Sequence, residues 1–135
     1  MFSIDHLGIA VKSLAEAKAF YQKLGLSVMG EETVEQEKVK LAMVPLGESR
    51  LELLEPTADD SPIAKFLTKR GEGLHHIALH VDNLETTVEE LKRQGVRLIN
   101  DQIQIGAGGH MYVFVHPSST GGVLLELCEE QPQGV

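Results

Sequence analysis

The chain has 135 residues, 42% of them hydrophobic, which fits one compact domain able to bury a core without disulfides or a structural metal. Its formal net charge is −8 and its twelve Lys and Arg are scattered, which excludes nucleic-acid binding and attraction to an anionic membrane. The single cysteine and the lack of a targeting signal or of about eighteen consecutive apolar residues favour a cytoplasmic protein.

The first part of the chain, approximately residues 1–58, predicts a β-α-β-β-β module. Apolar and polar residues alternate from Ser3 to Val11, which is typical of a half-buried strand. Ser13 and Glu16 have the spacing of a capping box, so a helix is expected over roughly 14–24, with Gly25 as its stop. Three short β-rich runs complete the module, at 27–31, 38–46 and 49–55.

A linker helix is predicted over approximately 61–70, because Ser61 suits the N-cap and Pro62 the first helical position. The second module, approximately 73–130, repeats the first. Its expected elements are a strand from Leu74 to Val81, a capping box at Asp82 and Glu85, a helix over 84–94 ending at Gly95, and β-rich runs at 97–100, 111–116 and 123–128. The predicted fold class is α+β, in a single domain spanning 1–135.

The repeat singles out two histidines and two glutamates. His6 aligns with His76 at an offset of 70 residues, and each copy ends in an apolar run with one glutamate between leucines, Glu52 or Glu126. An unpaired buried carboxylate is costly, and metal coordination is a standard way to hold one in a core. Two His and two Glu therefore predict a site for a first-row divalent ion, with Co²⁺, Ni²⁺, Mn²⁺ and Zn²⁺ as candidates.

Each of these residues alone has a simpler interpretation. A single His in a strand is more often structural than a ligand, and a single Glu between leucines often points to the solvated face of a sheet. Their repetition in both halves favours the metal site.

His75 must face away from His76, and His80 lies about 7 Å further along the strand, so neither is expected to be a ligand. The run Gly106–Gly109 could cradle an anion, although a plain hairpin is its commoner use.

Three segments carry a family resemblance. Asp5–Val11, His75–Ala78 and Leu125–Leu127 resemble the vicinal oxygen chelate superfamily, and within it residues 61–67, 73–77 and 116–127 are similar to methylmalonyl-CoA epimerases. The resemblance implies two paired βαβββ modules that form a curved mixed sheet around a metal-binding cleft. It also implies a divalent ion, Co²⁺ first, held by His6, Glu52, His76 and Glu126.

The resemblance further implies epimerisation of methylmalonyl-CoA at C2, by metal-assisted proton abstraction through an enolate. Glu126 is the first candidate acid/base, and Lys40, Glu37 or a metal-bound water would serve the other face. Epimerases often carry Gln at the position of Glu52, and some carry a glutamate acid/base at that of Lys40. An acyl-CoA is the expected small-molecule partner, and a homodimer is the expected assembly.

Two other functions remain open. The same site could isomerise a hemithioacetal, as lactoylglutathione lyase does, since that reaction also needs a metal and a carboxylate base. The fold also supports non-enzymatic resistance proteins, which sequester drugs in a metal-free cleft. A dioxygenase would be expected to use two His and one Glu, so the second Glu counts against that activity.

Overall fold

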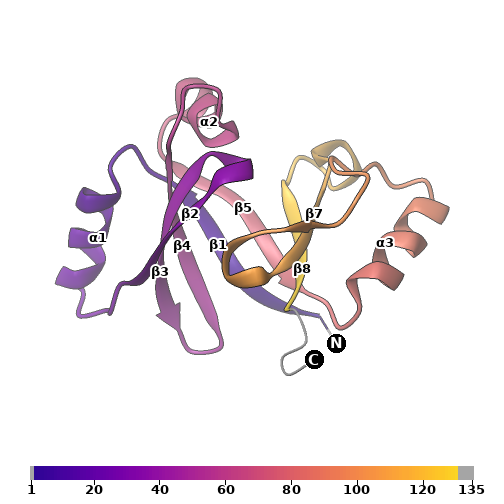
Figure 1. Cartoon of the computed structure of the whole chain (residues 1–135), viewed down its shortest axis with the longest axis horizontal. Coiled ribbons are helices and arrows are strands. Elements are labelled where there is room, and N and C mark those ends of the chain that lie inside the picture. The colour runs from indigo at the N-terminus through magenta and orange to yellow at the C-terminus, as the bar shows by residue number, and fades with distance from the viewer. Residues whose placement is uncertain (1, 131–135) are drawn as a thin grey trace. The chain divides into compact units, whose positions relative to one another are not determined.

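A computed structural model of the chain describes residues 2–130 (Figure 1). The predicted order β-α-β-β-β occurs twice, and the α+β fold class is confirmed. The first module and the linker helix consist of β1 (Ser3–Ala10), α1 (Leu14–Lys23), β2 (Met29–Val34), the 3-10 turn η1 (Glu35–Glu37), β3 (Val39–Leu46), β4 (Ser49–Pro56) and α2 (Pro62–Arg70). The second module consists of β5 (Gly73–His80), α3 (Leu84–Arg93), β6 (Gln104–Ile105), the turn η2 (Ala107–Gly109), β7 (Met111–Val115), the turn η3 (Pro117–Ser119) and β8 (Leu125–Glu129).

The chain divides into two compact units. One comprises His6–His75, and the other comprises the residues up to Asp5 together with those from His76 onward. The boundaries fall inside β1 and β5, close to the predicted ligands His6 and His76. Each unit therefore contributes one of the two predicted His residues and one of the two predicted Glu residues.

In the unit His6–His75 the strands follow the order β2-β3-β4-β1. β1 runs parallel to β4, while β3 is antiparallel to both β2 and β4. Helix α1 packs on β3 and β4 (Figure 1). The core on the helix-covered face is made of five buried residues, Val11, Leu14, Ala42, Val44 and Leu53.

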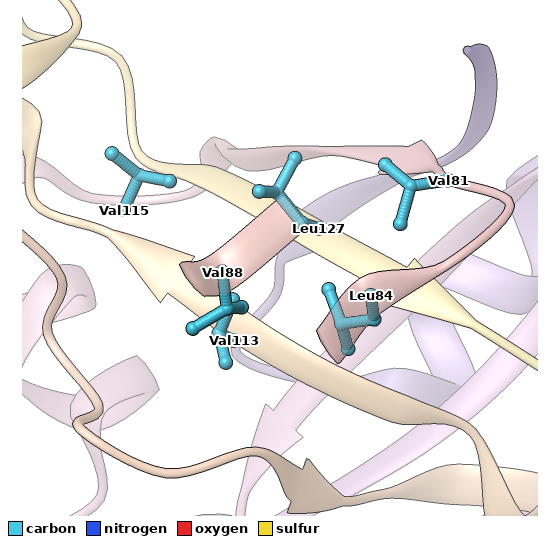
Figure 2. Packing of buried hydrophobic residues seen from close by; sticks show 6 residues of the cluster. All are labelled: Val81, Leu84, Val88, Val113, Val115 and Leu127. Carbon is cyan, nitrogen blue, oxygen red and sulfur yellow. The ribbon is translucent and has the colours of Figure 1, made fainter. Parts of the chain in front are cut away.

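In the other unit the order is β5-β8-β7-β6. β5 is parallel to β8, and β7 is antiparallel to β8 and β6. Figure 2 shows the core between α3 and this sheet, where Val88 of the helix lies beside Val113 of β7. The buried residues of this cluster are Val81, Leu84, Val88, Val113, Val115 and Leu127.

Helix ends follow the predicted chemistry with one correction. Ser13 accepts a hydrogen bond from the Glu16 N–H at the start of α1. At the start of α3, however, the cap is Asn83, whose Oδ1 accepts from the Thr86 N–H, and the predicted cap at Asp82 is wrong by one residue. An Asn amide oxygen satisfies the same unpaired N–H groups as an Asp carboxylate, so the sequence offers two caps in succession. Gly25 and Gly95, just beyond the two helices, have φ of 90° and 79°, as predicted for helix stops.

The predicted strand at 97–100 is the largest local difference. Leu98 forms an isolated bridge with Val115, and the edge strand of this sheet is the two-residue β6 further along the chain. The Asn100 side-chain oxygen accepts the Phe114 N–H at 3.2 Å. The Asn100 side chain thus takes the place of a backbone carbonyl as partner of β7, which ends the strand pairing at this residue. Among the described residues, no helix is long and apolar enough to span a membrane.

Candidate metal centre

The first predicted pair lies on neighbouring strands. His6 of β1 is opposite Arg50 of β4, and Glu52 is two residues beyond Arg50, so the three side chains share one face of the sheet. The His6 and Glu52 side chains are only 4% and 9% exposed, and His6 Nδ1 lies 3.4 Å from Glu52 Oε2. Arg50 donates to the same oxygen from Nε at 3.1 Å and from Nη2 at 2.8 Å. The contacts of His6 and Arg50 thus converge on the same carboxylate oxygen, Glu52 Oε2.

The second pair occupies the equivalent place in the other unit. Glu126 of β8 is opposite Ala78 of β5, which puts it on the same face as His76. His76 Nε2 lies 3.1 Å from Glu126 Oε1, and both residues are buried. The Phe114 ring packs edge-on against the His76 imidazole, with centroids 5.4 Å apart and planes at 89°. This packing fixes the plane of the imidazole that faces the carboxylate.

The two pairs have the donor chemistry of a metal ligand set. His6, His76 and Glu126 each offer one nitrogen or oxygen atom of the kind that binds a metal, and all three are buried. Imidazole nitrogen with carboxylate oxygen suits first-row divalent ions. Burial removes water from the carboxylates, which an ion or a cationic side chain must then compensate. The donor chemistry of His6, His76 and Glu126 therefore fits a metal ion, and the role of Glu52 as a fourth ligand stays a prediction.

Comparison with known proteins identifies the family. Residues 5–114 match the Glyoxalase/Bleomycin resistance protein/Dioxygenase superfamily. The chain belongs to this superfamily. The resemblance to the vicinal oxygen chelate proteins is thereby confirmed at superfamily level.

Three similar proteins include two methylmalonyl-CoA epimerases. An uncharacterized protein of Bacillus subtilis, YqjC, is 45% identical over 99% of this chain and 95% of its own length. Human mitochondrial methylmalonyl-CoA epimerase is 41% identical over 92% of this chain and 72% of its own length. A solved structure of methylmalonyl-CoA epimerase in complex with methylmalonyl-CoA and NH4+ has a TM-score of 0.90 and 37% identity, covering 94% of this chain and 93% of that one. Two of these three relatives are thus methylmalonyl-CoA epimerases, and one of the two is seen in complex with methylmalonyl-CoA.

Of the predicted second proton carriers, Lys40 faces away from the first His–Glu pair, and Glu37 lies in a turn rather than on the sheet. Met43 is directly opposite Glu52 on β3, whereas Lys40 is opposite Glu55, so Lys40 and Glu52 face opposite sides of the sheet. Lys40 Nζ pairs with Glu31 Oε1 at 3.1 Å. Glu37 belongs to the turn η1, where its carbonyl accepts from a buried hydroxyl. Neither residue is brought to the His6–Glu52 face by the sheet register, and their catalytic roles stay predictions.

His75, His116 and the glycine run make local contacts. His75 packs edge-on against Phe66 of α2 with centroids 5.0 Å apart. His116 Nδ1 accepts the Ser118 N–H at 3.0 Å and so caps η3. In the glycine run, the Gly106 N–H donates to the His110 carbonyl and the Gly109 N–H to the Gly106 carbonyl. Two of its N–H groups are thus used within the turn, which favours the plain hairpin over an anion cradle.

Two residues of the candidate centre were not predicted from the sequence, Arg50 and Phe114. Each lies on the same face as a predicted glutamate, Arg50 two residues before Glu52 and Phe114 directly opposite Glu126. The spacing of Arg50 was visible in the sequence, since residues two apart in a strand share a face. The position of Phe114 depends on the register between β7 and β8, which residue pattern alone does not set.

Proposed function

We propose that this chain is a metal-dependent methylmalonyl-CoA epimerase, which interconverts the R and S forms at C2. The observation that carries the proposal is the pair of buried His–Glu contacts at equivalent positions of the two modules, in a chain 41% identical to the human epimerase. The proposal includes one divalent ion held by His6, Glu52, His76 and Glu126, in a single domain formed by both modules.

The chemistry at C2 explains why this ligand set suits the reaction. The C2 proton of methylmalonyl-CoA lies between a thioester and a carboxylate, and removing it builds negative charge on the neighbouring oxygens. A bound divalent ion supplies Lewis-acid stabilisation of that charge. His6, Glu52, His76 and Glu126 would hold the ion, and it would need further positions open to the substrate oxygens.

Glu126 is the residue proposed to move the proton. Its Oε1 is 3.1 Å from His76 Nε2, a contact that orients the carboxylate. Glu126 is buried, and the half-buried Phe114 packs against its partner His76, so the carboxylate that would take the C2 proton is shielded from bulk water. Inversion needs a second carrier on the other face, and Lys40, Glu37 and a metal-bound water stay the candidates for it.

The assembly and partner follow from the same proposal. The substrate is an acyl-CoA, the ligand class found in the complex of the related epimerase. A homodimer is proposed because each unit has an edge strand to cover, β2 in one and β6 in the other. Sedimentation of the purified chain would measure this directly.

Deuterium wash-in at C2 of methylmalonyl-CoA in D₂O, followed by mass spectrometry, tests the reaction. We expect exchange with Co²⁺, none with EDTA, and a loss of at least about 100-fold in Glu126→Gln. Glu89→Gln is the matched control, since Glu89 is exposed on α3 and outside the site. A folded, Co²⁺-loaded protein that exchanges no C2 proton would contradict the proposal. Conversion of a hemithioacetal by that same preparation would instead favour a lactoylglutathione lyase.

A further inference from the structure

Arg50 makes a close charged contact to a predicted metal ligand, Glu52. Its Nε and Nη2 both donate to Glu52 Oε2, at 3.1 and 2.8 Å, and its side chain is only 20% exposed. Hydrogen bonds between a guanidinium and a carboxylate are among the strong ones, because both partners are charged. Arg50 and Glu52 therefore form a strong ion pair on this face of β4.

The sequence repeat shows that the fold itself does not require an arginine here. Glu52 corresponds to Glu126, so Arg50, two residues earlier, corresponds to Leu124. The second copy pairs Leu125–Cys128 of its last strand with β5, just as the first copy pairs β4 with β1, and it does so without a cation at this position. Strand pairing therefore does not require Arg50. What the arginine adds to the first copy is a positive charge beside Glu52.

The charge balance of the proposed centre gives Arg50 that role. Two carboxylates cancel the charge of a divalent ion, and the substrate then brings a further carboxylate to a neutral site. A guanidinium hydrogen-bonded to Glu52 restores one positive charge to the site. The Glu52–Arg50 pair then has no net charge, as a neutral amide ligand would. The guanidinium also holds Oε2, which leaves Oε1 to face the ion.

We propose that Arg50 is a positioning residue that sets the charge of the metal centre, by neutralising Glu52 and fixing which carboxylate oxygen meets the ion. This inference rests on the proposed function, because it takes Glu52 as a ligand. Two consequences follow from the electrostatics. Without Arg50, the apo protein carries an uncompensated buried carboxylate, and a divalent ion binds more tightly because the site is more negative.

The test measures Co²⁺ affinity by isothermal titration calorimetry and the apo melting temperature, all at one pH. We expect Arg50→Met to bind Co²⁺ about tenfold more tightly, Glu52→Gln to bind it about tenfold more weakly, and the double variant to return to within about threefold of wild type. Arg50→Met should melt lower than wild type as apo protein, and this deficit should shrink when Co²⁺ is present. Arg50→Lys keeps the charge and should stay near wild type in affinity.

A matched control and a kinetic readout separate this role from plain stabilisation. Arg93→Met removes an exposed arginine that pairs with Glu90 on α3, and it should leave Co²⁺ affinity unchanged. In the epimerase assay, Arg50→Met should raise KM for the anionic substrate by about tenfold and change kcat much less.

Each outcome bears on a definite statement. If wild type binds Co²⁺ but Arg50→Met binds it equally well or more weakly, Arg50 does not set the charge and this inference is overturned alone. If the double variant is as weak as Glu52→Gln, the carboxylate acts without its partner, with the same consequence. If wild type binds no divalent ion, both the proposed function and this inference fall.

Discussion

Glu31 is held by two lysines, one from the helix and one from the sheet. Lys18 lies 2.7 Å from Oε2 and Lys40 lies 3.1 Å from Oε1. Hydrogen bonds from Lys18 and then Lys40 keep the pKa of Glu31 below its ordinary value of 4.5. A carboxyl group whose pKa is lower in the folded state adds stability above its unfolded pKa and loses it as the pH falls through the folded one.

We therefore expect Glu31→Gln to lower the melting temperature slightly at pH 7, and this difference from wild type to vanish as the pH falls from 4.5 through the lowered pKa. The effect should also shrink in about 0.5 M salt, because the pair is exposed to solvent. Melting curves of both proteins across this range measure it, with Glu89→Gln as the control for net charge. A difference that grows in acid would mean that the lysines do not stabilise the ionised carboxylate.

At this scale the sequence predicted more of the site than of its surroundings. The repeat identified His6, Glu52, His76 and Glu126 because each stands out as a polar residue in an apolar run, and the structure places them in two buried pairs. Lys40 could not be placed in this way. Lys40 and Met43 are three residues apart, so their side chains lie on opposite faces of β3. Only the β3–β4 register shows that Met43 is the one opposite Glu52.

Among the elements, α2 begins at an unusually buried cap. Ser61 is fully buried, and its Oγ accepts the Ile63 N–H at 3.1 Å while its hydroxyl donates to the Glu37 carbonyl at 3.4 Å. We expect Ser61→Ala to cost about 1–2 kcal/mol, because the buried Ile63 N–H and the half-buried Glu37 carbonyl then lose this partner. Urea unfolding followed by circular dichroism gives this value.

Ser13 provides the comparison on α1. It makes the same cap, accepting the Glu16 N–H at 3.2 Å, but in a solvent-exposed place. Water can replace its hydroxyl, so Ser13→Ala should cost about 0.5–1 kcal/mol. Equal costs for the two variants would show that the bond to the turn η1 contributes nothing beyond an ordinary helix cap.

The helices and inner strands were predictable because their sequence signals are local. The edge strand of the second module was not. Ser13, Ser61 and the glycine stops bracket the helices in the sequence itself. A long-range contact also repeats in both modules, where Glu55 accepts the Leu14 N–H and Glu129 accepts the Leu84 N–H. These bonds join the last strand of each module to the start of its helix, and no local sequence pattern predicts them.

For the whole molecule, the sequence repeat divides the proposed metal ligands between two cores. His6 and Glu52 belong to one unit, and His76 and Glu126 belong to the other. An ion that binds all four residues requires both units to be folded, so its binding energy should stabilise them together. At about 1,000 times the dissociation constant, such an ion adds about 4 kcal/mol.

Equivalent valines in the two cores test this coupling. Val44 lies opposite Leu51 in the first unit, and Val115 lies opposite Leu125 in the second, each one residue past the partner of its glutamate. Both valines are buried, so Val44→Ala and Val115→Ala should each cost about 2 kcal/mol. Urea unfolding in EDTA and in excess Co²⁺ would measure both variants beside wild type.

We expect Co²⁺ to add the same increment to both variants, because ion binding is linked to the folding of either unit when each supplies a His and a Glu. An ion bound by only one pair would give a different pattern. It would stabilise the variant whose cavity lies in the ligand-bearing unit, and the other variant would show an early transition that Co²⁺ does not move. Equal increments in a single transition would therefore favour one shared centre, and a split transition would contradict it.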